Sequence, residues 1–196
     1  MNNLSTNDKP LRVLASIGFT VGGALGMAGS FAPSASLRAL AWGIDGVALV
    51  MASALLAVLF FRSGQDIVAA GFLVFAVGEG VILPGAAMDL AASGPSFGAG
   101  TGLWAMALAL ISGPRVFPIV VRLLGFAAAV LFAITAVQIF AGNPLSPLSR
   151  PLPFFAYPVF VATFVGWLWT LLRSDSPQNS ERSGLARLSP QPITMT

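Results

Sequence analysis

Residues 66–90, DIVAAGFLVFAVGEGVILPGAAMDL, form a nearly continuous apolar run with one carboxylate, Glu79, close to its middle. The run is long enough to cross a bilayer, because about 20 apolar residues in a helix span the hydrocarbon core. A charged side chain at that depth costs about 2.5–3.5 kcal/mol on insertion scales, so it normally faces protein or water and often has a function. The run therefore predicts a membrane-spanning helix that holds a polar group inside a protein.

Five further apolar runs fill most of the 196-residue chain, of which 56% is hydrophobic and only 9% is charged. A soluble domain usually has about a quarter charged residues. The runs are continuous, whereas the strands of a membrane β-barrel alternate, so helices are favoured. We therefore predict an all-α, polytopic membrane helix bundle of about six transmembrane helices. The spans are expected near residues 13–31, 37–61, 67–88, 97–112, 117–141 and 154–172.

These spans make up one predicted domain, residues 13–173, between two polar ends. Residues 1–12 are expected to form a cytoplasmic N-terminal segment, and residues 174–196, with Ser, Pro and Gln, a disordered cytoplasmic tail. A cleaved signal peptide is the alternative for the first run. Its length and its glycine pattern favour a membrane span.

The basic residues predict the orientation. With the N-terminus in the cytoplasm, eight of the ten Lys and Arg residues fall on the inner side, and only Arg38 and Arg150 fall in outer loops. The positive-inside rule then predicts that both termini lie in the cytoplasm, with the spans in the inner (plasma) membrane of the cell. The inner set comprises Lys9, Arg12, Arg62, Arg115, Arg122, Arg173, Arg182 and Arg187.

The chain has no Cys and no His, and its one Lys is Lys9 in the N-terminal segment. This composition excludes disulfides, thiol catalysis, Cys/His zinc sites, iron–sulfur clusters and His-ligated haem. It also excludes a Schiff-base cofactor inside the bundle, so we expect neither a cofactor nor a bound metal. The net charge of +3 comes from arginines at helix ends, which is a topology signal and does not indicate nucleic-acid binding.

Small residues mark two helix faces for close packing. Gly18, Gly22, Gly26 and Ser30 recur every four residues in the first span, and Gly71 and Gly78 are seven residues apart in the third. Such stripes let another helix approach closely. Two interpretations stay open: packing against a neighbouring span of the same chain, or a seam between copies in a homo-oligomer.

Two acids form the candidate intramembrane site. Asp45 shares its helix face with Ala41, Ala48 and Ala52, which predicts that it points into the bundle. At about 1.5 Å per residue, Asp45 and Glu79 both lie about 12 Å below the outer surface, on antiparallel neighbouring spans. They are therefore expected to share a proton, to flank a cavity or to bind a cation together. The structural alternative is that each acid is protonated and hydrogen-bonded to a backbone carbonyl or a hydroxyl.

Two more residues complete the candidate site. Pro84 cannot donate a hydrogen bond to the carbonyl of Gly80, so it is expected to kink the third span just beyond Glu79. Freed carbonyls beside an acid are found at ion and proton sites in transporters, although ordinary kinks also free them. Arg38, two turns from Asp45 on the outer side, is the expected counter-charge.

The layout of GLW (102–104), GPRVFPIVVRLLGF (113–126) and VGWLWTLLR (165–173) resembles that of small six-helix bacterial inner-membrane proteins of an uncharacterised family. The likeness lies in hydropathy and in arginine placement. It implies six spans and carries over no catalytic residue.

Three functions stay open. The first is a small proton- or cation-linked transport or permeation protein with an acidic site between the second and third spans. The second is a non-catalytic accessory or assembly subunit of a membrane complex, with a membrane-protein partner or a second copy beside it in the lipid bilayer. The third and least favoured is an intramembrane enzyme that uses an acid pair, because no GxGD motif is present.

Overall fold

The computed structural model describes residues 8–87, 90 and 92–173. Within these ranges it is all-α, as predicted. The predicted tail, 174–196, and the first seven residues of the N-terminal segment lie outside the described part. The elements are α1 (Lys9–Ser30), α2 (Ala35–Arg62), α3 (Asp66–Ile82), the 3₁₀ turn η2 (Leu83–Ala87), α4 (Gly94–Ser112), α5 (Ile119–Phe140) and α6 (Ala156–Arg173).

All six α-helices are long and apolar enough to cross a membrane, α3 when counted through Gly85. Their outward faces are apolar as well. Every helix carries a large hydrophobic side chain that is more than half exposed: Ile17, Leu40, Leu73, Met106, Val137 and Val165. Helices that are apolar on both faces suit lipid as their solvent. The chain is a multi-pass membrane protein, and the predicted helical fold is confirmed.

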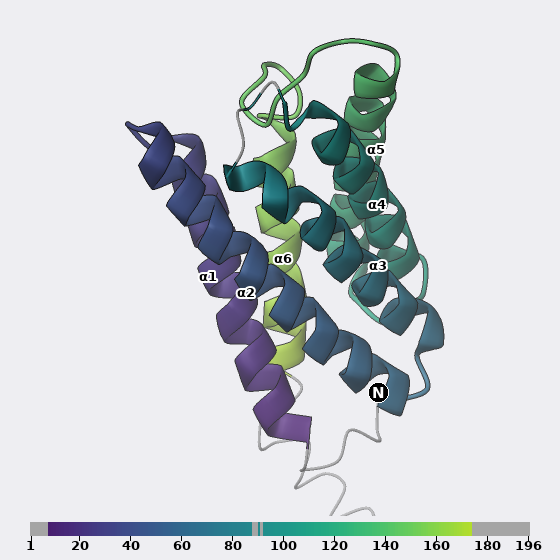
Figure 1. Ribbon diagram of the computed structural model, residues 1–196. Helices are drawn as coiled ribbons and strands as arrows, with labels where there is room; N and C mark the ends of the chain where they lie inside the picture. Colours follow the sequence, from purple (N-terminus) through teal and green to yellow (C-terminus); the bar gives the residue numbers. More distant parts are fainter. Residues whose placement is uncertain (1–7, 88–89, 91, 174–196) are drawn as a thin grey trace, which may run out of the picture.

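The helices form a closed ring, because each one packs on its neighbours in the chain and α6 also packs on α1. Figure 1 shows that α1 begins and α6 ends at the same end of the bundle. We call this the terminal end. The opposite end, which we call the loop end, carries the connections 31–34 and 141–155 and the 3₁₀ turn η2.

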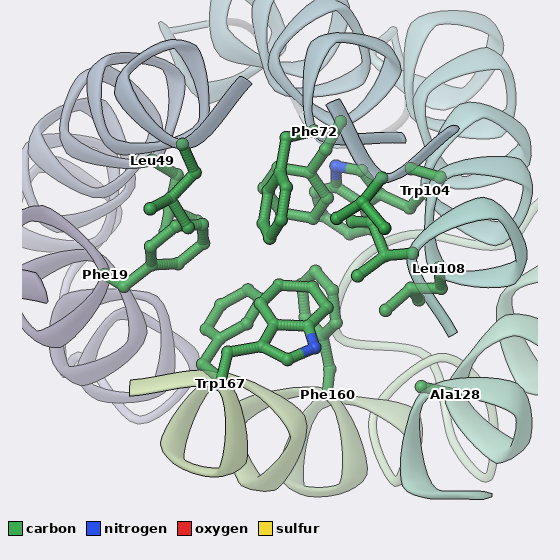
Figure 2. Close-up of a cluster of buried hydrophobic side chains, with 14 of the residues drawn as sticks. Phe19, Leu49, Phe72, Trp104, Leu108, Ala128, Phe160 and Trp167 are labelled. Carbon is green, nitrogen blue, oxygen red and sulfur yellow. The ribbon is translucent and has the colours of Figure 1, made fainter. Parts of the chain in front are cut away.

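Aromatic side chains fill the centre of the ring. Figure 2 shows Phe19, Phe72, Phe160 and Trp167 pointing inward from α1, α3 and α6. The Trp167 ring lies edge-on to Phe72, with centroids 5.0 Å apart, and to Phe19 at 5.8 Å. Such edge-to-face contacts each contribute about 0.5–1.5 kcal/mol beyond area burial. Because lipid tails are as apolar as these rings, close packing and not exclusion from water holds the bundle together.

The helix ends depart from the predicted spans where proline sits. α3 stops at Ile82 and the chain continues as η2, since Pro84 has no N–H to offer the Gly80 carbonyl. In contrast, α1 and α4 begin about one turn before their predicted starts. Each has a proline in its first turn, where the missing N–H costs nothing.

Arg122 ties α5 to the end of α4 at the terminal end. Its Nε donates to the Ser112 carbonyl and its Nη2 to the Gly113 carbonyl, both at 2.7 Å. Carbonyls at a helix C-terminus have no partner within the helix, and a cation there also offsets the helix dipole. The guanidinium therefore fixes the α4–α5 corner.

Candidate functional site

Asp45 and Glu79 line the same two cavities inside the ring. The larger, of about 40 Å³, lies toward the loop end between α2, α3, α4 and α6, and we call it the loop-end cavity. The smaller, of about 10 Å³, lies between α1, α2 and α6. Four residues line both: Asp45 from α2, Glu79 from α3, Trp104 from α4 and Tyr157 from α6. We call these four the acid cluster.

Glycines of α1 make the room for Asp45. A Cβ on Gly26 would lie 2.8 Å from Asp45 Oδ2, and one on Gly22 would lie 3.2 Å from Asp45 Oδ1. The carboxylate therefore rests against bare α1 backbone. Trp42, one turn earlier on α2, donates from Nε1 to the Gly26 carbonyl at 3.2 Å. Helices α1 and α2 are thus fastened directly beside Asp45.

Glu79 is placed by a close approach of α3 to α4. A Cβ on Gly78 would lie 3.3 Å from the Gly100 carbonyl oxygen and 3.0 Å from Trp104 Cδ1. Only glycine lets two backbones come this near. The approach brings Trp104 beside the adjacent Glu79 and leaves the Glu79 side chain 3% exposed. Asp45 and Tyr157 line the same two cavities as Glu79.

The carboxylates differ from the buried hydroxyls in their hydrogen bonding. Thr101, Thr135 and Thr163 each donate to a carbonyl one turn earlier on their own helix. Asp45 Oδ1 and Glu79 Oε1 are buried yet accept no hydrogen bond from the described part of the chain. Buried polar atoms of this kind are rare and call for an explanation. Trp104 Nε1 in the acid cluster likewise has no partner, whereas Ser16, Ser53 and Ser112, whose hydroxyls are also unpartnered, line neither cavity.

Pro84 and Arg38 line neither of the two cavities. Gly80 and Pro84 are both exposed, whereas Glu79 is buried. Arg38 has its guanidinium 5.8 Å from the Trp42 ring. Within residues 8–87 it makes no ion pair with Asp45, and it lines neither cavity.

Of the remaining predicted packing residues, Gly18 and Gly71 lie at helix–helix contacts inside the chain. A Cβ on Gly18 would meet Ala52 and the Ala48 carbonyl of α2, and one on Gly71 would meet Ile111 of α4. Ser30 donates to the carbonyl of Gly26 on its own helix. The stripe of α1 therefore faces α2, which accounts for it without a second copy.

Sequence reasoning missed the aromatic members of the site. Trp104 and Tyr157 complete the acid cluster, and Phe97 and Trp42 line the loop-end cavity. The sequence carries one faint signal for them: Tyr157 is the only tyrosine in a chain rich in Phe. Their positions on α4 and α6 gave no indication that they would meet Asp45 and Glu79.

The described ranges contain no group of three or more acidic, Cys or His side chains that would hold a metal ion. Comparison with known proteins adds no assignment. No protein-family model, curated protein or solved structure matches this chain. The resemblance to small bacterial inner-membrane proteins thus extends to the six-helix layout and identifies no family.

Proposed function

We propose that this protein is a small membrane transport protein that binds a proton or a cation between Asp45 and Glu79. One observation carries the proposal. Two carboxylates on neighbouring, antiparallel helices face one cavity, and each has a buried oxygen that accepts no hydrogen bond from the described chain. A purely structural acid would be expected to hydrogen-bond to the helices that it joins.

The position of the loop-end cavity indicates from which side of the membrane an ion would enter. Ser93, Ser96 and Pro147 line the cavity at the loop end, whereas packed rings occupy the centre toward the terminal end. Of the described basic residues, Lys9, Arg12, Arg62, Arg115, Arg122 and Arg173 lie near the terminal end. By the positive-inside rule that end is cytoplasmic, so the cavity belongs to the outer half.

The packed centre also bears on mechanism. Phe75, Phe160 and Phe164 lie in mutual ring contact, with centroids 4.4 to 5.8 Å apart, on the terminal side of the acid cluster. No open pore crosses a layer of this kind, since rings at these separations leave no room for water. A bound ion would reach the cytoplasm only after the helices that carry these rings move apart. The proposal is therefore a site that faces one side at a time, and not a permanently open channel.

Flux through proteoliposomes tests the proposal. We expect wild-type vesicles to show a proton or sodium flux, measured with an internal pH-sensitive dye and with tracer sodium. Glu79→Gln should abolish it, because the amide keeps the shape of the side chain and removes the charge. The matched control is Asp66→Asn, an exposed acid in the first turn of the same helix, which should retain the flux. Identical leakage from wild type and Glu79→Gln, both folded, would refute the proposal.

A further inference from the structure

The loop-end cavity has an unusual lining for an ion site. Its walls combine acids with aromatic rings, and no Lys or Arg is among its lining residues. The rings come from α2, α4 and α6, so they surround the two carboxylates on several sides. The members that matter are Asp45, Glu79, Trp42, Phe97, Trp104 and Tyr157.

This lining does not suit a bare metal ion. Calcium takes about 6–8 oxygen ligands, and magnesium demands a nearly complete octahedron of oxygens. Here two carboxylates face mainly rings and aliphatic side chains, and the described residues offer no third acidic ligand. A dehydrated metal ion would be left without most of its ligands.

Aromatic faces attract cations, and they accept the methyl groups of organic ammonium ions particularly well. The unpartnered oxygens Asp45 Oδ1 and Glu79 Oε1 need N–H donors. A primary alkylammonium ion matches both the carboxylates and the rings. It has three N–H donors on one side for the carboxylate oxygens and an alkyl group on the other for the ring faces. We infer that the loop-end cavity binds a small primary alkylammonium cation. This inference deepens the proposed function and rests on it.

The size of the cavity limits the substrate. About 40 Å³ is room for a few water molecules, so a short alkyl chain fits and a bulky amine does not. The ammonium group would donate to Asp45 and Glu79, and the alkyl group would lie against Trp104 and Phe97. Selectivity over potassium and sodium would come from the N–H hydrogen bonds to the carboxylates and from the contact of the alkyl group with the rings, neither of which a spherical metal ion can make.

The probe is methylammonium, titrated into purified protein in nanodiscs and followed by tryptophan fluorescence and by binding of the radiolabelled ion. We expect saturable binding that an equal concentration of potassium or sodium does not displace. Glu79→Gln should weaken binding by about tenfold or more, because a charge-assisted hydrogen bond is lost. Trp104→Phe keeps an aromatic ring in place and should weaken methylammonium binding less than Glu79→Gln does. Asp66→Asn is the control and should bind as wild type does.

The outcomes separate this inference from the proposed function. Methylammonium that fails to bind, beside a flux that still depends on Glu79, would overturn the ammonium assignment and leave the transport proposal standing. Equal competition by potassium would overturn it too, because the site would then bind any monovalent cation. If Glu79→Gln does not fold, thermal stabilisation of the wild type by methylammonium but not by potassium supports the inference, and equal shifts contradict it.

Discussion

The interior of this bundle differs between its two ends, although the same six helices enclose both. Toward the terminal end the rings of Phe60, Phe72, Phe117 and Trp167 pack against one another. Toward the loop end the helices enclose the acid cluster and two cavities. The terminal half is closed by packed rings, whereas the loop half leaves space beside two carboxylates whose buried oxygens accept no hydrogen bond from the described chain.

Side chains on α1 account for much of the difference. Phe19 fills the middle of the ring, in contact with Phe72, Phe75, Phe164 and Trp167. One and two turns later, Gly22 and Gly26 present bare backbone instead, and Asp45 occupies the space. The change from a ring to a glycine on one helix face thus turns a packed core into a polar site. The site therefore depends on the absence of side chains at Gly22 and Gly26 of α1.

The largest expected effect tests the packed half. Trp167→Ala should lower the free energy of unfolding by about 3–5 kcal/mol, because it removes a buried ring and leaves a void among rings that pack against it. Denaturation in mixed micelles measures the change. The control is Trp169→Ala, two residues on and 59% exposed, which loses mainly its stacking with Arg173 and should cost about 1 kcal/mol or less. Equal losses would show that the terminal half is not a packed core.

The next effect tests the space beside Asp45. Gly26→Ala should destabilise the protein by about 1–3 kcal/mol, since the new methyl group would lie 2.8 Å from Asp45 Oδ2 and must displace it. Both flux and methylammonium binding should fall as well. In the matched Gly80→Ala variant the added methyl group meets nothing within 4 Å, so stability and binding should stay near wild type. A neutral Gly26→Ala would mean that α1 does not set the position of the carboxylate.

The smallest expected effect tests the acids themselves. Glu79→Gln should change the free energy of unfolding by less than about 1 kcal/mol, because Oε1 accepts no hydrogen bond that the amide would break. Denaturation in mixed micelles measures this change in the free energy of unfolding, with Trp167→Ala as the reference for a large loss. A loss of several kcal/mol would make Glu79 a structural group, and the contrast between the two halves would then be one of packing alone.

Much of the architecture follows from the sequence, because each span is a local property. About 20 apolar residues must form a helix in lipid, since every backbone N–H and C=O has to be bonded within the segment. The position of Pro84 likewise determines where α3 ends. The similar depth of Asp45 and Glu79 was also predictable, because rise per residue and span order set it, and both acids do line the same cavities.

The rest of the site could not be predicted in this way. Arg38 and Pro84 are near the acids in sequence but line neither cavity, since Arg38 lies against the Trp42 ring and Pro84 is exposed. The partners that do meet them, Trp104 and Tyr157, come from α4 and α6. In lipid nearly every residue of a span is apolar, so the pattern along a helix says little about which face turns inward.

The amino-acid pattern alone therefore predicts about six membrane spans, with two acids at a similar depth. Only the tertiary structure decided that α1 faces α2 with its glycines, that α6 closes the ring, and that four aromatic side chains surround the acids. The physical reason is that insertion into the bilayer depends on each segment alone. Which side chains line the interior depends on how the six helices are rotated and packed against one another. The local sequence pattern does not specify this packing.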